Sequence, residues 1–159
     1  MSICKPENLT TLSEKNKSIL GLDIGTKSIG ISISDTRLII ASPLKLIKRK
    51  KYSDDARELL KIIDKNSIGG LVVGLPIELS GKEGRQAQSI RTFVSNLMEI
   101  INIPTTFWDE RFSTSVIQRI MIEEADLTRK KRSKVIDKLS AVYILQGYLD
   151  YLSNSKHMK

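Results

Sequence analysis

The sequence predicts an α/β protein with one mixed five-stranded sheet and helices on its faces. Its 159 residues have the length of one domain. Three strand-like runs come before the first helical pattern, and this order favours an antiparallel meander. Two later strands are each reached through a helix, which is typical of parallel strands joined by crossover connections.

The predicted meander opens with an apolar run over 19–24, which indicates a strand buried on both faces. A turn over 25–30 follows. Residues 31–34 alternate Ile and Ser, and this period of two predicts a second strand that pairs with the first as a hairpin. A third strand is expected over 38–47, where Pro43 favours a position at the edge of the sheet.

The next segment predicts a helix, a strand and a second helix. Ser53 is expected to cap a helix that opens with Asp54 and Asp55, because acids are favoured in the first turn. A strand follows over 71–75. The clearest amphipathic pattern lies at 85–101, where apolar side chains recur at steps of three and four residues, and it predicts a helix that covers the sheet.

The last part of the chain predicts one strand and two helices. The strand is expected over 105–108, and a helix over about 113–124 follows it. Residues 126–133 read as a basic loop. The final helix is expected from about 133 to 152.

The composition excludes several kinds of chemistry. An apolar fraction of 40% and a charged fraction of 28% are typical of a soluble globular protein. Cys4 is the only cysteine, so an intrachain disulfide is impossible. His157 is the only histidine and lies near the end of the chain. A metal site built from several histidines is therefore excluded, and a histidine-based catalytic triad is disfavoured.

The net charge of +8 comes from two basic stretches. Residues 45–51 hold five basic residues and no acid, and residues 129–138 hold six basic residues and one acid. The remaining positions are mildly acidic. Concentrated positive patches of this kind favour a polyanionic partner such as a nucleic-acid backbone. Two solvated basic loops are the simpler alternative.

The predicted organisation is a single domain with short ends. Residues 1–17 are polar, without the apolar core of a secretory signal, and are expected to form a flexible extension. Residues 18–152 form the domain, and 153–159 form a tail. No apolar run approaches the ~20 residues that cross a bilayer. We therefore expect a cytoplasmic monomer or homodimer without a membrane association.

Acidic residues in unusual places indicate the site. Asp23 lies inside the most apolar strand, where an unpaired carboxylate costs several kcal/mol. Asp109 and Glu110 follow the 105–108 strand, and Asp137 begins an otherwise apolar face of the last helix. Such carboxylates meet at the carboxyl ends of parallel strands. With no usable His or Cys nearby, they favour Mg²⁺ or Mn²⁺ and the cleavage of phosphodiesters.

Several segments in the same order resemble the YqgF/RuvX family, whose members are described as Holliday junction resolvase-like proteins and as pre-16S rRNA nucleases. The similarity runs from about residue 18 to 152. The segments that carry it are GLDIGTKSIGISISD (21–35), VVGLP (72–76), GKEGRQAQSIRTF (81–93), DERFST (109–114) and IDKLSAVYILQGYLD (136–150). Leu-Ser-Ala at 139–141 departs from the two alanines usual in the family.

The resemblance implies an RNase H-like fold and dependence on Mg²⁺ or Mn²⁺. It implies that Asp23, Glu110 and Asp137 are the catalytic, metal-binding acids, with Asp109 as the alternative to Glu110. Basic side chains are expected to contact the phosphates of the nucleic acid. These are Lys27, Arg111, Lys48, Arg49, Lys50, Lys51, Arg129, Lys130, Lys131, Arg132 and Lys134.

The favoured function is a metal-dependent nuclease that processes the 5′ end of pre-16S rRNA during ribosome biogenesis. A Holliday junction resolvase acting on four-way DNA is an alternative, because both substrates present phosphates and neither basic stretch reads bases. A non-catalytic RNA-binding protein of the same fold is another. A sugar-kinase or Hsp70-like ATPase shares the Asp23–Thr26 pattern but requires two such domains.

Overall fold

The computed structural model describes residues 3–78, 80–110 and 129–157, with 129–138 as backbone alone. Its sheet has the order β3-β2-β1-β4-β5, with β1 (Ser18–Ile24), β2 (Ser28–Ser34), β3 (Ala41–Lys48), β4 (Ile68–Leu75) and β5 (Thr105–Asp109). The first three strands are antiparallel, and β4 and β5 run parallel to β1. The predicted mixed five-stranded sheet is confirmed.

Strand β3 lies at the sheet edge, as Pro43 predicted, and Pro43 lies beside an irregularity in the β2–β3 register. The strand begins at Ala41 rather than at Leu38. The cause is local: Oδ1 of Asp35 accepts hydrogen bonds from the amides of Ile39 and Ile40 at 2.7 and 3.0 Å. These bonds hold the residues before Ala41 in a turn.

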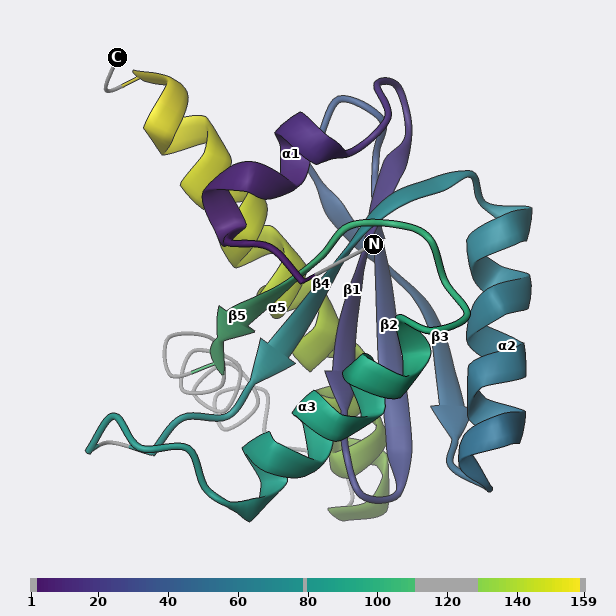
Figure 1. Ribbon diagram of the computed structural model, residues 1–159. Coiled ribbons are helices and arrows are strands. Elements are labelled where there is room, and N and C mark those ends of the chain that lie inside the picture. The colour runs from purple at the N-terminus through teal and green to yellow at the C-terminus, as the bar shows by residue number, and fades with distance from the viewer. Residues whose placement is uncertain (1–2, 79, 111–128, 158–159) are drawn as a thin grey trace.

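Helices α2 (Tyr52–Lys65) and α3 (Arg85–Leu97) cover one face of the sheet (Figure 1). Between helices and sheet lies the larger apolar core, which includes Leu22 of β1, Leu59 of α2 and Phe93 of α3. Helix α2 starts after Lys51 without a side-chain cap, so the predicted cap at Ser53 is wrong. Helix α3 has the predicted apolar face but ends at Leu97, four residues before the predicted end.

Helix α5 (Arg129–His157) covers the opposite face (Figure 1). It packs Ile144, Leu145 and Tyr148 against the sheet. The helix includes residues 129–133, which we expected in a loop, and residues 153–157, which we expected in a tail. Neither Gly nor Pro interrupts these two stretches, so nothing local ends the helix there. The helix predicted over 113–124 lies outside the described residues.

Residues 3–17 differ from the flexible extension that we expected, because they pack on the domain. They contain a 3₁₀ turn η1 (Pro6–Asn8) and the short helix α1 (Leu9–Leu12). Leu9 is fully buried against α5. The Cys4 amide donates to the carbonyl of Thr105 at 2.8 Å, and Oη of Tyr148 donates to the carbonyl of Pro6 at 2.9 Å. The segment therefore links the start of β5 to α5.

Candidate active site

Two predicted acids come together at one end of the sheet. Asp23 is the penultimate residue of β1, and Glu110 directly follows β5. Because β1, β4 and β5 are parallel, their carboxyl ends lie at the same edge. Strand β4 lies between the two acids, and its Gly74 has no side chain, so Glu110 reaches across the strand.

Both acids lie on the face that α5 covers. Along β1 the side chains of Leu22 and Ile24 enter the core under α2 and α3, so Asp23 between them faces the other way. The side chain of Glu110 lies where a Cβ of Gly74 would be, and the Cδ1 methyl of Ile144 from α5 lies beside the same position. Glu110 rather than Asp109 is thus the acid of the DER segment that meets Asp23.

The two carboxyl groups interact strongly. Burial of Glu110, together with the charge of Asp23 and a side-chain hydrogen bond to it, raises the pKa of Glu110 to about 7. The charge of Asp109 adds to this rise in pKa. Two carboxylates so close together repel each other, and either a shared proton or a cation relieves that repulsion.

Helix α5 approaches this end of the sheet closely. At Gly21, two residues before Asp23, a Cβ would lie 2.7 Å from Cβ of Leu145 and 2.9 Å from the carbonyl oxygen of Ala141. Oγ of Ser32 donates to the same carbonyl of Ala141 at 2.6 Å. Asp137 belongs to α5 one turn before Ala141. Its side chain lies outside the described residues.

The described donors are oxygens from two neighbouring carboxylates, the chemistry that Mg²⁺ and Mn²⁺ prefer. Within the described residues, no group of three or more His, Cys, Asp or Glu side chains is arranged to hold a metal. The pair fits part of a hard-cation site, with charge that a divalent ion would offset. Further ligands could be water, substrate oxygens or other residues of the chain.

The predicted phosphate contacts differ in their surroundings. Lys27, Lys48, Lys50 and Lys51 are exposed. Arg49 instead has internal partners: Nη1 donates to the carbonyl of Gly25 at 2.8 Å, and Nε lies 3.4 Å from Oδ2 of Asp55. Arg111 lies outside the described residues, and of 129–134 only the backbone is described.

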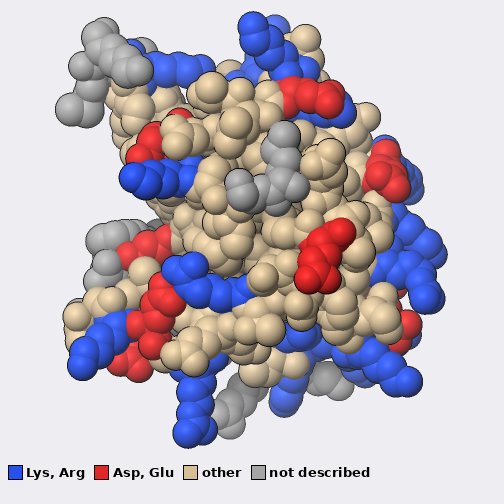
Figure 2. All heavy atoms as spheres, in the orientation of Figure 1, with Lys and Arg blue, Asp and Glu red and all other residues tan. Residues whose placement is uncertain are grey.

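The exposed lysines belong to the same end of the molecule as the acids. The Arg49 amide donates to the carbonyl of Lys27 at 2.9 Å, so the 45–51 stretch lies beside the β1–β2 turn that follows Asp23. Figure 2 shows Lys and Arg side chains along the right margin, over α2, and along the lower margin, below the sheet. The sheet end that holds the acids is thus bordered by positive charge.

Two features of this region were missed in the sequence. Gly74 makes room for Glu110, and its signal was a glycine in an otherwise apolar strand. Asp55 was expected only as a first-turn acid of α2. Its side chain is 1% exposed and also accepts a hydrogen bond from the Lys50 amide at 3.0 Å. It anchors the basic stretch to the domain.

The strand order, with acids at the ends of β1 and β5, defines an RNase H-like protein. RuvC of T. thermophilus, from the structure "T. thermophilus RuvC in complex with Holliday junction substrate", matches with a TM-score of 0.55 and 9% identity. The match covers 86% of this chain and 96% of that one. At this identity the likeness shows the fold, and it confirms the predicted fold class.

The chain belongs to the RuvX family: the family model described as "RuvX: Holliday junction resolvase" matches residues 17–151. Curated relatives named "Putative pre-16S rRNA nuclease" are similar over most of the chain. The relative from Paramagnetospirillum magneticum is 46% identical over 94% of this chain and 96% of its own length. The relative from Rhodospirillum rubrum is 42% identical over 98% and 97%.

Proposed function

We propose that this protein is a metal-dependent endonuclease that processes the 5′ end of pre-16S rRNA in the cytoplasm. The observation that carries the proposal is the contact between Asp23 and Glu110 at one end of an RNase H-like sheet. The similarity to relatives with the pre-16S rRNA nuclease name supports the choice of substrate. Within the described residues, no helix is long and apolar enough to cross a membrane.

Asp23, Glu110 and Asp137 would hold one or two Mg²⁺ or Mn²⁺ ions. Support comes from the raised pKa of Glu110, since a cation offsets the repulsion that burial intensifies between the two described carboxylates. Asp137 lies one turn before Ala141 of α5, whose carbonyl oxygen approaches Gly21 of β1, and this supports a contribution from Asp137. A bound ion would polarise a phosphoryl oxygen and stabilise the charge that develops during cleavage.

The acidic and basic side chains of this chain would position the attacking water and the substrate. In their ionised form Asp23 and Glu110 would accept hydrogen bonds from the attacking water and so orient it. Exposed Lys27, Lys48, Lys50 and Lys51 hold backbone phosphates at the same end of the sheet. Arg111 and the basic start of α5, Arg129 to Lys134, would extend this surface. Lysine contacts to phosphates carry no base readout, so RNA sequence would be read through shape.

Four-way junction DNA is the second candidate substrate. It is favoured by the description of the family, "RuvX: Holliday junction resolvase". Resolution of a symmetric junction requires two cuts, which favours a homodimer, whereas trimming of rRNA requires one active site. A non-catalytic RNA-binding protein would retain the basic surface and show no response to divalent ions.

The test incubates the purified protein with 5′-extended pre-16S rRNA and with four-way junction DNA, each with Mn²⁺, Mg²⁺ or EDTA. We expect cleavage of the RNA with a divalent ion and none in EDTA. Asp23→Asn should abolish cleavage, whereas the control Asp64→Asn, at an exposed acid on α2, should leave it unchanged. Cleavage of the junction alone would reassign the substrate.

Thermal melting separates a nuclease from a binder. Mn²⁺ or Mg²⁺ should raise the Tm of the wild type more than that of Asp23→Asn, because the variant lacks one ligand charge. Without metal, Asp23→Asn should be at least as stable as the wild type, since the substitution removes repulsion with Glu110. No stabilisation of either protein by metal, without cleavage, would favour a non-catalytic RNA-binding protein.

A further inference from the structure

A cleft lies at the same end of the sheet as the two acids but on the opposite face. It has a volume of about 300 Å³ and lies between the β1–β2 turn and the first turns of α3. Figure 1 shows the turn and the start of α3 together at the lower end of the sheet. Its polar lining comes from Thr26, Arg49, Arg85, Gln86 and Ser89.

One cation of this cleft is held rigidly. The guanidinium of Arg49 donates to the carbonyl of Gly25, pairs with Asp55 and lies 5.3 Å from the centre of the Phe93 ring. Among the described residues, Nη2 of Arg49 has no hydrogen-bond partner. A preorganised guanidinium with free N–H donors loses little entropy when it binds an oxyanion.

The other cation supplies the excess charge. Arg85, the first residue of α3, is exposed and forms no ion pair with another described residue. Since Asp55 balances Arg49, Arg85 leaves the cleft with a net positive charge. None of the described lining residues is acidic. Hydroxyl and amide groups of Thr26, Ser89 and Gln86 add hydrogen-bond donors suited to phosphate oxygens.

We propose that this cleft binds a backbone phosphate of the substrate strand other than the scissile one, with Arg85 as the principal contact. The inference rests on the proposed function. A strand with one phosphate at Asp23 and Glu110 reaches the cleft by crossing the β1–β2 turn, where Lys27 is exposed. The contacts are to phosphate, so the cleft positions the strand without reading its bases.

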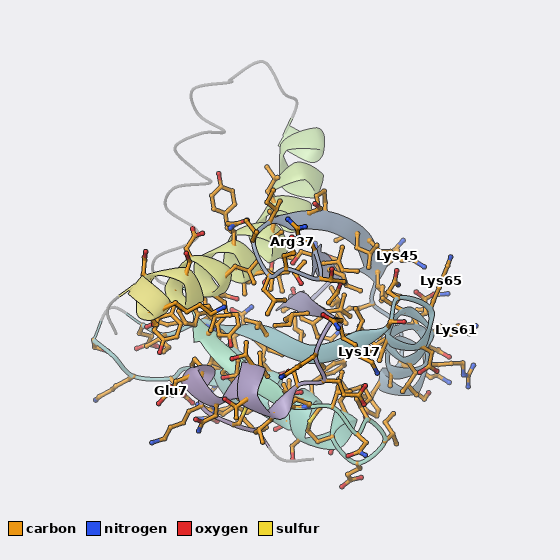
Figure 3. The ribbon with its side chains drawn as sticks, turned by 90° about the horizontal axis from the view of Figure 1, so that it is seen from above. Glu7, Lys17, Arg37, Lys45, Lys61 and Lys65 are labelled. Carbon is orange, nitrogen blue, oxygen red and sulfur yellow. The ribbon has the colours of Figure 1, made fainter. Side chains whose placement is uncertain are left out.

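The first experiment measures binding of a labelled single-stranded RNA from the 5′ flank of 16S rRNA, in EDTA, over a range of salt concentrations. Arg85→Ala should reduce the slope of log K against log[salt] by about 0.7, the value for one phosphate contact on a single strand. Lys65→Ala removes the same charge at the far end of α2 (Figure 3) and should leave the slope unchanged. An equal effect of both variants, or no effect of Arg85→Ala, would overturn the proposal.

A second pair of variants tests the cleft without removing a cation. Ser89→Glu places an acid among the lining residues and should weaken RNA binding by about tenfold or more, since like charges across a contact cost several kcal/mol. Ser95→Glu adds the same charge at an exposed site farther along α3 and should have little effect. Both positions are exposed, so the fold should persist, and circular dichroism checks this.

Chemically modified RNA identifies the phosphate. Single neutral methylphosphonate linkages, moved stepwise from the cleavage site, should weaken binding to the wild type at one or two positions. Arg85→Ala should be insensitive at the same positions. Binding is measured in EDTA and does not depend on cleavage. If the protein cleaves no RNA in the separate assay with Mn²⁺ or Mg²⁺, the proposed nuclease is refuted but this binding test still holds. Equal sensitivity of Arg85→Ala and wild type at every linkage would refute the cleft in an otherwise active enzyme.

Discussion

Glu110 occupies the space that a side chain on Gly74 would fill. A Cβ at Gly74 would overlap Oε1 of Glu110 and Cδ1 of Ile144, both at the far ends of flexible side chains. The missing side chain on β4 therefore sets how closely Glu110 approaches Asp23. In the proposed nuclease Gly74 would be a positioning residue, because it would act on the substrate only through Glu110.

Gly74→Ala should displace Glu110 and lower kcat by at least about tenfold, the usual lower range for loss of ligand orientation. The fold should survive, since the atoms that must move are side-chain ends. Gly70→Ala is the control on the same face of β4, where a Cβ would meet Leu9 and Ser13 rather than the acids. It should reduce the Tm and leave kcat unchanged. A Gly74→Ala enzyme with wild-type kcat and metal affinity would contradict this role.

Glu110→Gln should cost far more activity than Asp109→Asn. Glu110 contacts Asp23 on the α5 face. Asp109 is the last residue of β5, directly before Glu110, so its side chain points to the other face of the sheet. We expect a loss of about 10²-fold or more in kcat for Glu110→Gln, and a much smaller loss for Asp109→Asn. Single-turnover cleavage of the RNA substrate gives the ranking, and the opposite order would move the role to Asp109.

Stability of the metal-free protein should fall as the pH rises from about 4.5 to 7. Glu110 binds its proton more tightly in the folded state, with a pKa of about 7, than in the unfolded chain, where the ordinary value is 4.5. Its contribution is fully present below pH 4.5 and is lost as the pH passes 7, about 3 kcal/mol in total. Urea denaturation in EDTA at several pH values measures this.

Glu110→Gln supplies the control for that pH profile. The variant lacks the titrating group, so its stability should depend less on pH over the same range. Saturating Mg²⁺ or Mn²⁺ should also flatten the wild-type profile, because a bound cation favours the ionised carboxylate. A wild-type profile as flat as that of the variant in EDTA would show that Glu110 does not titrate in this range.

The ion pair between Arg49 and Asp55 should be a major element of stability. Arg49→Ala leaves the carboxylate of Asp55, 1% exposed, without its cation, and should reduce the free energy of unfolding by about 3–5 kcal/mol. Arg57→Ala is the control. Its partner Asp54 lies 3.9 Å away at the surface, and such pairs contribute about 0–1 kcal/mol. Similar losses for both variants would contradict the assignment of Arg49 as the cation that stabilises the buried Asp55.

Local patterns predicted most of the fold. The Ile and Ser alternation of β2 directs Ile31 to the core and Ser32 to α5, where it bonds Ala141. Residues 3–17 could not be predicted, because a single buried anchor, Leu9, lies in a polar stretch and its partners are distant in sequence. The start of β3 depended on one side chain, Asp35, that competes with the strand for backbone amides.

The site was predicted in part. Asp23 was recognisable as an acid in an apolar strand. The choice of Glu110 over Asp109 came from the family resemblance, because strand alternation alone leaves open which of the two enters the site. The distribution of charge along the sequence did not predict the role of Arg49. This residue belongs to the basic stretch, yet its guanidinium donates a hydrogen bond to Gly25 and forms an ion pair with Asp55. Whether a cation meets solvent or an internal acid depends on tertiary packing, which charge patterns do not encode.

The amino-terminal segment depends for its packing on parts of the chain that are synthesised much later. The Cys4 amide forms a hydrogen bond with Thr105, and the Pro6 carbonyl forms one with Tyr148. These partners leave the ribosome about 100 and 140 residues later than the segment itself, so the segment cannot form its contacts before then. Until then Leu9 has no α5 to pack against. Closing such long loops is slow, so a nascent or truncated chain without α5 should engage chaperones through this end.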